Sequence, residues 1–321
     1  MTDWRPTATV QAARNRAAML RRIREYFEAH DVLEVDTPAL SPYAVSDTQI
    51  ESLEIRNSLV SQRPMYLHTS PEFCMKRLLA AGYPDIYSIC RVFRDAESGR
   101  RHQPEFMMIE WYRHDCDLRA IIGDTLELIN AALDSDRLVG NHVVHDYQDV
   151  FVEATGVNPL TADIHELANA AQADDPLTQS IGDERDDWLD LLLATRVTPL
   201  FATNQLTVLR HYPASQAALA RLCPDDSRVA DRFEVFLGTV ELANGYVELT
   251  DADEHSRRLL ADNEHRRRRG LPLRPHDRSL LAALQTGLPN SAGVAMGLER
   301  LQMIHDATDD IHDVISFSFE A

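Results

Sequence analysis

Three carboxylates, Glu234, Glu241 and Glu248, interrupt an otherwise apolar stretch, EVFLGTVELANGYVELTD, which has the pattern of a half-buried β-hairpin. We place the turn at Gly238–Thr239. Phe236 then opposes Glu241, and Glu234 lies on the same face as both. Neighbouring carboxylates repel each other unless a cation lies between them, and hard oxygen ligands suit Mg²⁺. We therefore predict that Glu234 and Glu241 bind Mg²⁺; the alternative is that they are exposed carboxylates on a solvent-facing strand.

The second strand of this hairpin has three polar side chains in alternation, Asn244, Tyr246 and Glu248. Alternate residues of a strand share a face, so these three side chains lie together. Strict alternation would place them on the face opposite Glu241. We therefore predict a β-bulge at Ala243–Asn244–Gly245, which brings all four side chains into one pocket and which the glycine makes feasible.

A basic loop joins two further predicted strands, IYSICRVFRDAE and EFMMIEWYRH. Arg94 lies near the end of the first strand, and Phe106 and Glu110 share a face of the second. A strand interior rarely contains Arg or Glu unless another group compensates the charge. One interpretation is that Arg94 binds phosphate and a carboxylate, while Arg101 and His102 reach over a nucleotide from the loop. The other is an internal Arg94–Glu110 ion pair beside a solvated loop.

A strand with two glycines runs directly into a helix near the end of the sequence, at SAGVAMGLERLQ. Gly293 and Gly297 allow the backbone to approach a ligand closely, and Arg300 lies on the first turn of the helix. An arginine beside a glycine-lined strand can bind a triphosphate. Many helices begin after a glycine pair, so this pattern alone is weak evidence.

Together these segments resemble the class II aminoacyl-tRNA synthetases. Arg94 with PEF downstream is similar to motif 2 of that family, and the G-x-x-x-G-x-[DE]-R pattern that ends at Arg300 is similar to motif 3. EVDTPAL, which contains Pro38, is similar to motif 1, the dimer interface of the family. The segments SPEFCMKRL, RHQPEFMMIEWY and ELANGYVEL resemble the lysyl branch, and the similarity extends over almost the whole chain. The resemblance implies an α+β class II synthetase catalytic fold, with an antiparallel sheet flanked by helices.

Within the lysyl branch, the chain is similar to the stand-alone paralogues that ligate (R)-β-lysine to elongation factor P. The segments HYPASQAALA, ELANGYVELTDA and GVAMGLER carry this similarity. It implies an AMP-forming ligase that uses ATP and Mg²⁺ to activate (R)-β-lysine or lysine as an adenylate and transfers it to a lysine ε-amine of elongation factor P. It also implies a homodimer that needs no tRNA. The alternatives are a truncated lysyl-tRNA synthetase-like enzyme that charges tRNA, and an inactive regulatory paralogue.

The resemblance also implies roles for individual residues. Arg94 and Arg300 are the catalytic residues, because they stabilise charge on the phosphoryl oxygens. The implied ATP-binding residues are Arg94, Glu97, Arg101, His102, Phe106, Glu234, Glu241, Gly297 and Arg300, with Glu234 and Glu241 as the metal ligands. The implied amino-acid-binding residues are Ser70, Glu72, Glu110, Tyr112, Asn244, Tyr246, Glu248 and Ala295. Glu248 pairs with the side-chain ammonium of the amino acid, Tyr246 lines its methylene chain, and Phe106 stacks on adenine.

The sequence departs from the family pattern at three positions. Ala96 stands where motif 2 often has glutamate, so that Glu97 or the backbone makes the nucleotide contact, or the contact is absent. Ala295 stands where lysyl-tRNA synthetases usually have glycine, and its methyl group should narrow the pocket and disfavour α-lysine. Gln103 replaces the usual asparagine, which we expect to be tolerated.

The pattern along the chain favours one catalytic domain over residues 1–321, with no anticodon-binding domain and with a mostly helical connecting region at about 150–200. Helices are expected at 11–30, 71–82, 118–133, 154–159, 162–175 and 186–197, and strands at 31–40, 206–213 and 313–319.

The overall charge is −19, from 51 acidic and 32 basic residues, which opposes nucleic acid as the main partner. A local basic run, HRRRRG at 265–270, could dock an acidic partner or could be a solvated helix face. No apolar run approaches the roughly 18 residues of a membrane helix, and the first residues do not have a secretory signal pattern.

The cysteines and histidines show no metal-ligand spacing. Cys74, Cys90, Cys116 and Cys223 are scattered, with no CxxC pair, which favours reduced thiols in a cytoplasmic protein over a zinc site. His68, His211 and His276 show no ligand spacing, and we expect them to have structural roles and not to bind a metal.

Overall fold

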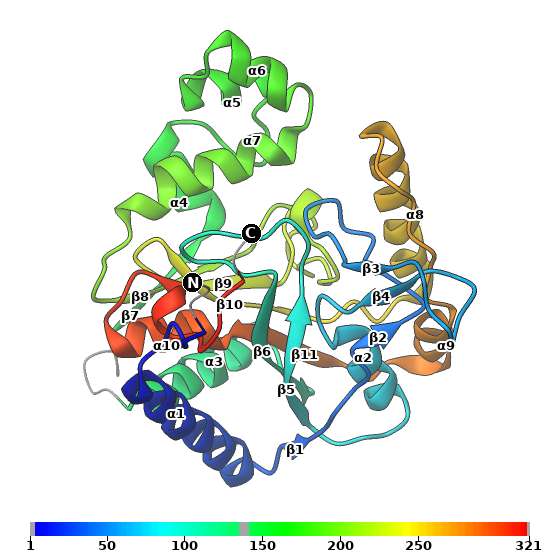
Figure 1. The fold of residues 1–321 in the computed structure, drawn as a ribbon. Helices are drawn as coiled ribbons and strands as arrows, with labels where there is room; N and C mark the ends of the chain where they lie inside the picture. The colour runs from blue at the N-terminus through cyan, green and yellow to red at the C-terminus, as the bar shows by residue number, and fades with distance from the viewer. Residues whose placement is uncertain (1–3, 135–140, 320–321) are drawn as a thin grey trace.

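An eight-stranded mixed sheet forms the centre of the molecule (Figure 1). The computed structural model describes residues 4–134 and 141–319. In spatial order, the strands are β1 (Leu33–Glu34), β5 (Ile86–Phe93), β6 (Glu105–His114), β11 (Ser291–Gly297), β10 (Val240–Val247), β9 (Arg232–Leu237), β8 (Leu206–Arg210) and β7 (His142–Asp146). The α+β prediction is confirmed. The sheet is not antiparallel throughout, because the pairs at its two edges, β1–β5 and β7–β8, are parallel.

Parallel neighbours require a long crossover between them, and the chain supplies one at each edge. Between β7 and β8 it forms the helices expected in the connecting region. Between β1 and β5 it forms a small three-stranded sheet and a helix. The strands of the small sheet are β2 (Leu40–Ser41), β4 (Met65–Leu67) and β3 (Glu54–Ile55).

Helices cover one face of the large sheet, and further helices lie beside its ends and against part of its other face (Figure 1). They are α1 (Val10–Ala29), α2 (Glu72–Ala80), α3 (Leu118–Leu133), α4 (Tyr147–Thr155), α5 (Ile164–Ala171), α6 (Asp175–Ile181), α7 (Arg185–Leu192), α8 (Ala252–Arg268), α9 (Arg278–Gly287) and α10 (Leu298–Asp306). Side-chain caps fix several helix starts: Thr9 accepts a hydrogen bond at the start of α1, and Asp117 does so at the start of α3. None of the described helices is both long enough and apolar enough to span a bilayer.

The main core lies between the sheet and the layer formed by α1, α3 and α10. Phe27 of α1 stacks on Tyr87 of β5, with ring centroids 4.1 Å apart, and meets the ring of Trp111 on β6 edge-on at 5.8 Å. Burial of each such side chain contributes roughly 1.5–3 kcal/mol. This packing fixes one face of β5 and β6.

Successive side chains of a strand point to opposite faces, so β6 contributes one set of residues to the core and another set to the opposite face. On β6, Ile109 and Trp111 join the core under the helices, whereas Met108, Glu110 and Tyr112 line a cavity. The sheet therefore separates the apolar core under α1, α3 and α10 from a cavity that is lined by charged side chains.

The β9–β10 hairpin has the predicted turn and the predicted pairing of Glu241 with Phe236. The bulge was predicted at Ala243–Asn244–Gly245, but the register shifts earlier, between Glu241 and Ala243. Asn244 consequently pairs with Glu234. The bulge has the predicted effect of bringing the polar side chains of both strands to one face.

Gly245 has a packing role rather than the predicted role in the bulge. A Cβ at this position would lie 2.7 Å from Cε1 of Phe233 and 2.8 Å from Cγ2 of Val294. Contacts this short do not occur between real side chains, so glycine is required where β9 and β11 press against β10.

Three predicted elements are wrong in extent. The strand expected at 31–40 is two separate two-residue strands, β1 and β2, and Pro38 lies between them. Of the helix expected at 154–159, only Ala154 and Thr155 are helical, as the last residues of α4 (Tyr147–Thr155), which Gly156 terminates in the left-handed conformation. The strand expected at 313–319 is absent: the chain forms a 3₁₀ turn at Ile311–Asp313, and its described residues then continue without regular structure.

The helices α4 to α7 form a lobe beside β7 and β8, seen in green in Figure 1. The lobe has its own apolar cluster, built around Trp188 of α7, Phe151 of α4 and Leu167 of α5. Phe236 of β9 packs against this cluster, which ties the lobe to the central hairpin. The acidic start of α7 faces the large cavity described next.

Candidate functional site

Two cavities that share lining residues lie on the polar face of the sheet, with volumes of about 1120 Å³ and 350 Å³. The predicted residues that line the larger cavity are Ser70, Glu72, Arg94, Arg101, His102, Glu110, Tyr112, Glu234, Glu241, Asn244, Tyr246, Glu248, Ala295 and Arg300. The predicted residues that line only the smaller cavity are Glu97, Phe106 and Gly297. Arg94 and Arg300 border both cavities. The structure therefore brings all the predicted site residues together.

The floor of the larger cavity contains three acidic residues: Glu72 of α2, Glu110 of β6, and Glu248, which directly follows β10. Hydroxyl groups orient two of them. Ser70 Oγ donates to Glu110 Oε2 at 2.6 Å, and Tyr112 OH donates to Glu110 Oε1 at 2.7 Å. Tyr246 OH donates to Glu72 Oε1 at 2.6 Å, and α2 begins at Glu72, whose backbone N–H donates to Ser70 Oγ. We call Glu72, Glu110 and Glu248 the acidic floor.

A buried lysine, which the sequence analysis missed, lies among these carboxylates. Lys76 Nζ is 2.6 Å from Glu72 Oε1 and 2.5 Å from Glu248 Oε2, and its side chain is fully buried. Breaking such a pair by removing one partner leaves an uncompensated charge and costs roughly 3–5 kcal/mol. The four-residue spacing from Glu72 to Lys76 on a helix was the available signal. The sequence could not show that Glu248 would complete the pair.

The ammonium of Lys76 cannot by itself neutralise three ionised carboxylates on the floor. Burial raises the pKa of Glu110 to about 7, and the charge of Glu72 adds to this shift. Burial also raises the pKa of Glu248 to about 8, although Lys76 opposes the shift. Burial alone would raise the pKa of Glu72 as well, but Lys76 and Tyr246 hold it below its usual value. A cationic ligand would lower the two raised pKa values, so the floor favours cations.

Gly293 of β11 packs directly against the acidic floor. A Cβ at this position would lie 2.5 Å from Cε1 of Tyr112 and 2.6 Å from Oε1 of Glu248. That Glu248 oxygen has no hydrogen-bond partner among the described residues. Glycine is therefore needed here to leave room for a carboxylate that still has an acceptor to offer.

The predicted metal ligands, Glu234 and Glu241, lie on the β9–β10 hairpin. Burial and the charge of Glu241 raise the pKa of Glu234 to about 7. Arg232, a second residue that the sequence analysis missed, lies 2.7 Å from Glu234 Oε1, and Arg300 lies 3.3 Å from Glu241 Oε2. Two acidic groups whose repulsion is only partly compensated are hard oxygen donors that fit Mg²⁺.

Arg94 lies at the entrance to the smaller cavity, directly after β5. Its guanidinium carbon is 5.2 Å from the ring centroid of Phe106, and its NH1 is 3.5 Å from Glu97 Oε1. The alternative of an Arg94–Glu110 ion pair is wrong, since Glu110 accepts hydrogen bonds from Ser70 and Tyr112 instead. The left-handed backbone at Ala96, with φ of 63°, turns the chain so that Glu97 lines this cavity.

The predicted basic residues of the β5–β6 loop, Arg101 and His102, contact Thr239 and Arg300. His102 Nε2 lies 2.7 Å from NH2 of Arg300, and burial together with the charge of Arg300 lowers the pKa of His102. A neutral imidazole can accept that hydrogen bond. Arg101 donates to Thr239 Oγ1 at 3.0 Å, across from the hairpin turn. The loop is thereby held against the tip of the hairpin.

The basic run at 265–270 is not simply a solvated helix face. Arg266 is buried and lies 2.7 Å from Glu51 Oε2, so it has an internal partner. Arg268 lines the larger cavity, and the remaining two arginines pair with acidic neighbours. The positive charge that this run could offer a docking partner is therefore reduced.

Comparison with known proteins identifies similar chains. The family model of class II tRNA synthetases (D, K and N) matches residues 1–321. An elongation factor P–(R)-β-lysine ligase of Histophilus somni is 41% identical over 321 residues, which is 99% of this chain and 98% of the relative. The protein of the same name from Pseudoalteromonas translucida is 42% identical over 326 residues, 98% of this chain and 97% of the relative. That from Edwardsiella ictaluri is 41% identical over 324 residues, 100% of this chain and 98% of the relative.

The packing of Gly293 predicts opposite effects for two glycine-to-alanine substitutions. Gly293→Ala should lower the free energy of unfolding by about 1–3 kcal/mol, because the new methyl group overlaps Tyr112 and Glu248. Gly123→Ala is the matched control: it lies in α3 with no atom within 4 Å of the added Cβ, and should stabilise the helix by roughly 0.5–1 kcal/mol. Urea denaturation measures both changes. Equal stability of the Gly293→Ala variant and the unsubstituted protein would contradict the close packing.

Proposed function

This chain belongs to the class II tRNA synthetases of the D, K and N group, and we propose that it is an ATP-dependent ligase that activates (R)-β-lysine as an aminoacyl-adenylate and transfers it to a lysine ε-amine of elongation factor P. The shared name of relatives at 41–42% identity over nearly the full chain supports this function. The single structural observation that carries this proposal is the acidic floor of the larger cavity, which shares Arg94 and Arg300 with the smaller cavity.

The charge on the floor supports a substrate with two amino groups. Lys76 pairs with Glu72 and Glu248, and Glu110 is the third carboxylate of the floor, so the fully ionised floor has a deficit of two positive charges. (R)-β-lysine provides two ammonium groups. We propose that Glu248 Oε1, which lacks a partner among the described residues, accepts the side-chain ammonium, and that the Glu72–Glu110 side accepts the other.

Ala295 supports the choice of the β-amino acid. It pairs with Asn244 across β10 and β11, and it lines both cavities. A methyl group at this junction narrows the space for the reacting end of the amino acid. We propose that it selects against α-lysine, whose amino group is one carbon nearer to the carboxylate.

The nucleotide would bind in the smaller cavity. Phe106 would stack on adenine. Arg94 and Arg300 line both cavities, so the carboxylate and the α-phosphate would meet beside them. Mg²⁺ held by Glu234 and Glu241 would supply charge stabilisation to the phosphates. The guanidinium groups orient the reacting groups and stabilise the charge that grows on the phosphoryl oxygens.

The mouth of the larger cavity supports a lysine as the acceptor. Asp186, Asp187 and Asp190 of α7 line this cavity. An acidic entrance attracts a protonated amine and repels the phosphates of tRNA. We propose that the enzyme acts in the cytoplasm, where elongation factor P and ATP are available, and that it is a homodimer through the segment around Pro38.

The acceptor distinguishes the proposed ligase from its alternatives. Incubation with ATP, (R)-β-lysine and elongation factor P should add the mass of one lysyl group to the factor, measured by mass spectrometry of the intact protein. Total tRNA with labelled lysine should remain uncharged in the same buffer. If tRNA is charged and elongation factor P keeps its original mass, the synthetase alternative is favoured. If neither lysine nor (R)-β-lysine supports the exchange of pyrophosphate into ATP, the inactive paralogue is favoured.

The assignment of Glu248 predicts a selective loss in the Glu248→Gln variant. Amino-acid affinity should fall roughly 10- to 100-fold, because a hydrogen bond to a charged group contributes about 1.5–3 kcal/mol. ATP affinity should remain within about twofold of the original value, since Glu248 lines only the larger cavity. Calorimetric titration measures each affinity separately. Glu241→Gln is the matched control, and should change the Mg²⁺ requirement rather than amino-acid affinity. Equal losses of both affinities in Glu248→Gln would contradict the assignment.

A further inference from the structure

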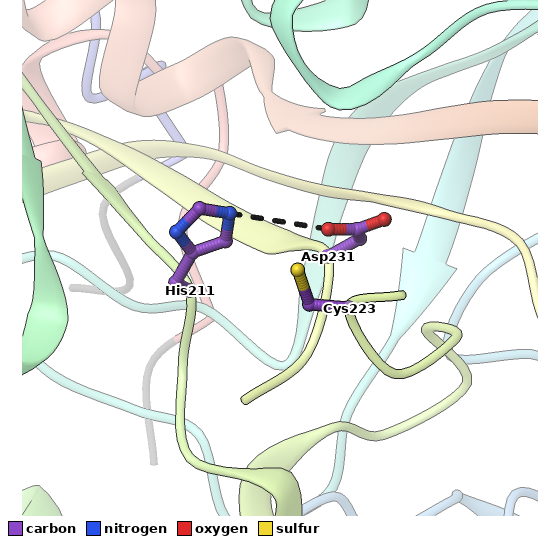
Figure 2. Close-up of side chains that lie close together, drawn as sticks. All are labelled: His211, Cys223 and Asp231. Atoms are coloured by element: carbon purple, nitrogen blue, oxygen red, sulfur yellow. Dashed lines mark ion pairs between the residues drawn. The ribbon is translucent and has the colours of Figure 1, made fainter. Parts of the chain in front are cut away.

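Three side chains that could bind a metal, and that the proposed reaction does not use, lie together where the loop between β8 and β9 meets these strands (Figure 2). His211 directly follows β8, Asp231 directly precedes β9, and Cys223 lies in the loop between these strands. One ligand atom from each residue lies within 4.8 Å of the other two. His211 Nε2 is 3.9 Å from Asp231 Oδ1, the contact marked in Figure 2.

Backbone hydrogen bonds position all three residues independently of any ligand. The N–H of His211 donates to the carbonyl of Arg232, and the N–H of Asp231 donates to the carbonyl of Arg221. The N–H of Cys223 donates to the carbonyl of Val229. The three side chains therefore converge from a fixed frame, which lowers the entropic cost of binding an ion.

The outer contacts of the group have the form found around protein-bound metals. His211 Nδ1 lies 2.8 Å from Asp146 Oδ1, so the carboxylate fixes the ring with Nε2 directed toward Cys223 and Asp231. Metal-binding histidines usually donate their second nitrogen to a carboxylate in this way. Arg221 Nε holds Asp231 Oδ2 at 2.8 Å, which leaves Oδ1 toward the group. We call His211, Cys223 and Asp231 the loop triad.

We propose that the loop triad binds one Zn²⁺ ion. Imidazole nitrogen, thiolate sulfur and carboxylate oxygen are the three donor types of protein zinc sites, at bonds of about 2.0–2.3 Å. Binding requires the side chains to close by roughly an ångström and the Cys223 thiol to release its proton. His211 and Cys223 are part-exposed, so water can occupy the fourth position of the tetrahedron.

The ion would fix the loop that walls the larger cavity. Residues 214–219 of this loop and Leu222 line that cavity. Gln216 also accepts a hydrogen bond from Arg232 NH1 at 2.6 Å through its carbonyl, and Arg232 in turn holds Glu234. Zinc at the loop triad would therefore stabilise the wall of the amino-acid cavity without contacting the reacting groups.

Zinc titration of the reduced, EDTA-treated full-length chain against a chromophoric chelator tests the proposal. The unsubstituted protein should bind one equivalent at the loop triad. Cys223→Ser should weaken this binding at least tenfold. Asp146→Asn removes the charge of the carboxylate that orients His211 and also pairs with Arg210, and it should weaken zinc binding roughly 10- to 100-fold. Cys116→Ser is the matched control, since Cys116 lies outside the group, and should bind as the unsubstituted protein does. No competition for zinc by the unsubstituted protein, or unchanged binding in Cys223→Ser, would overturn the proposal.

Alkylation of the unsubstituted protein gives a second readout that does not depend on the folding of a variant. Zinc should slow labelling of Cys223 by iodoacetamide at least tenfold, as measured by peptide mass spectrometry, while labelling of Cys116 should not change. Equal labelling of Cys223 with and without zinc would overturn the proposal. Zinc that binds at Glu234 and Glu241 instead would leave Cys223 unprotected, so this outcome also counts against the loop triad.

Discussion

One buried ammonium, that of Lys76, is shared between two carboxylates on the floor of the larger cavity, with a third carboxylate beside them. The cost of burying these charges is offset only in part within the protein, as the raised pKa values of Glu110 and Glu248 indicate. The folded chain therefore has a site whose electrostatics improve when a cation enters. We infer that this incomplete compensation is the physical basis of amino-acid recognition, because a floor with balanced charge would have no preference for a diamino acid.

The sheet makes this arrangement possible. Its helix-covered face carries the apolar contacts that stabilise the fold, which leaves the other face available for groups that would be costly in a core. The register shift after Glu241 connects the two roles that we propose for the hairpin, binding of Mg²⁺ and binding of the amino acid. It directs the metal-ligand candidates and the amino-acid-binding candidates of β10 to the same side, so that nucleotide and amino acid can meet at the arginines.

Much of this site could be predicted from the sequence, because strand alternation and hairpin pairing are local properties. They gave the pairing of Glu241 with Phe236 and the common face of Asn244 and Tyr246. The exact place of the bulge could not be predicted, since a glycine is explained equally well by a bulge and by the close packing found at Gly245. Edge strands of two residues, such as β1, are defined by their partners and not by their own composition.

Groups assembled from distant parts of the chain were the hardest to predict. Lys76 was visible as a helical neighbour of Glu72, but its burial depends on Glu248, which arrives from a strand far along the sequence. The loop triad has no motif spacing, because β8 and β9 bring its ends together only in the folded protein. The sequence indicated scattered cysteines and structural histidines, whereas convergence of their side chains is a tertiary property.

The most direct measurement of the central claim is calorimetric titration with three ligands: (R)-β-lysine and the two amino acids that each lack one of its amino groups, 3-aminohexanoic acid and 6-aminohexanoic acid. We expect each missing ammonium to weaken binding at least tenfold, and we expect (R)-β-lysine to release protons near pH 7 as the carboxyl groups of the floor ionise. Equal affinity for all three ligands, with no proton release, would contradict a floor whose carboxyl groups ionise to pair with the two ammonium groups of the ligand.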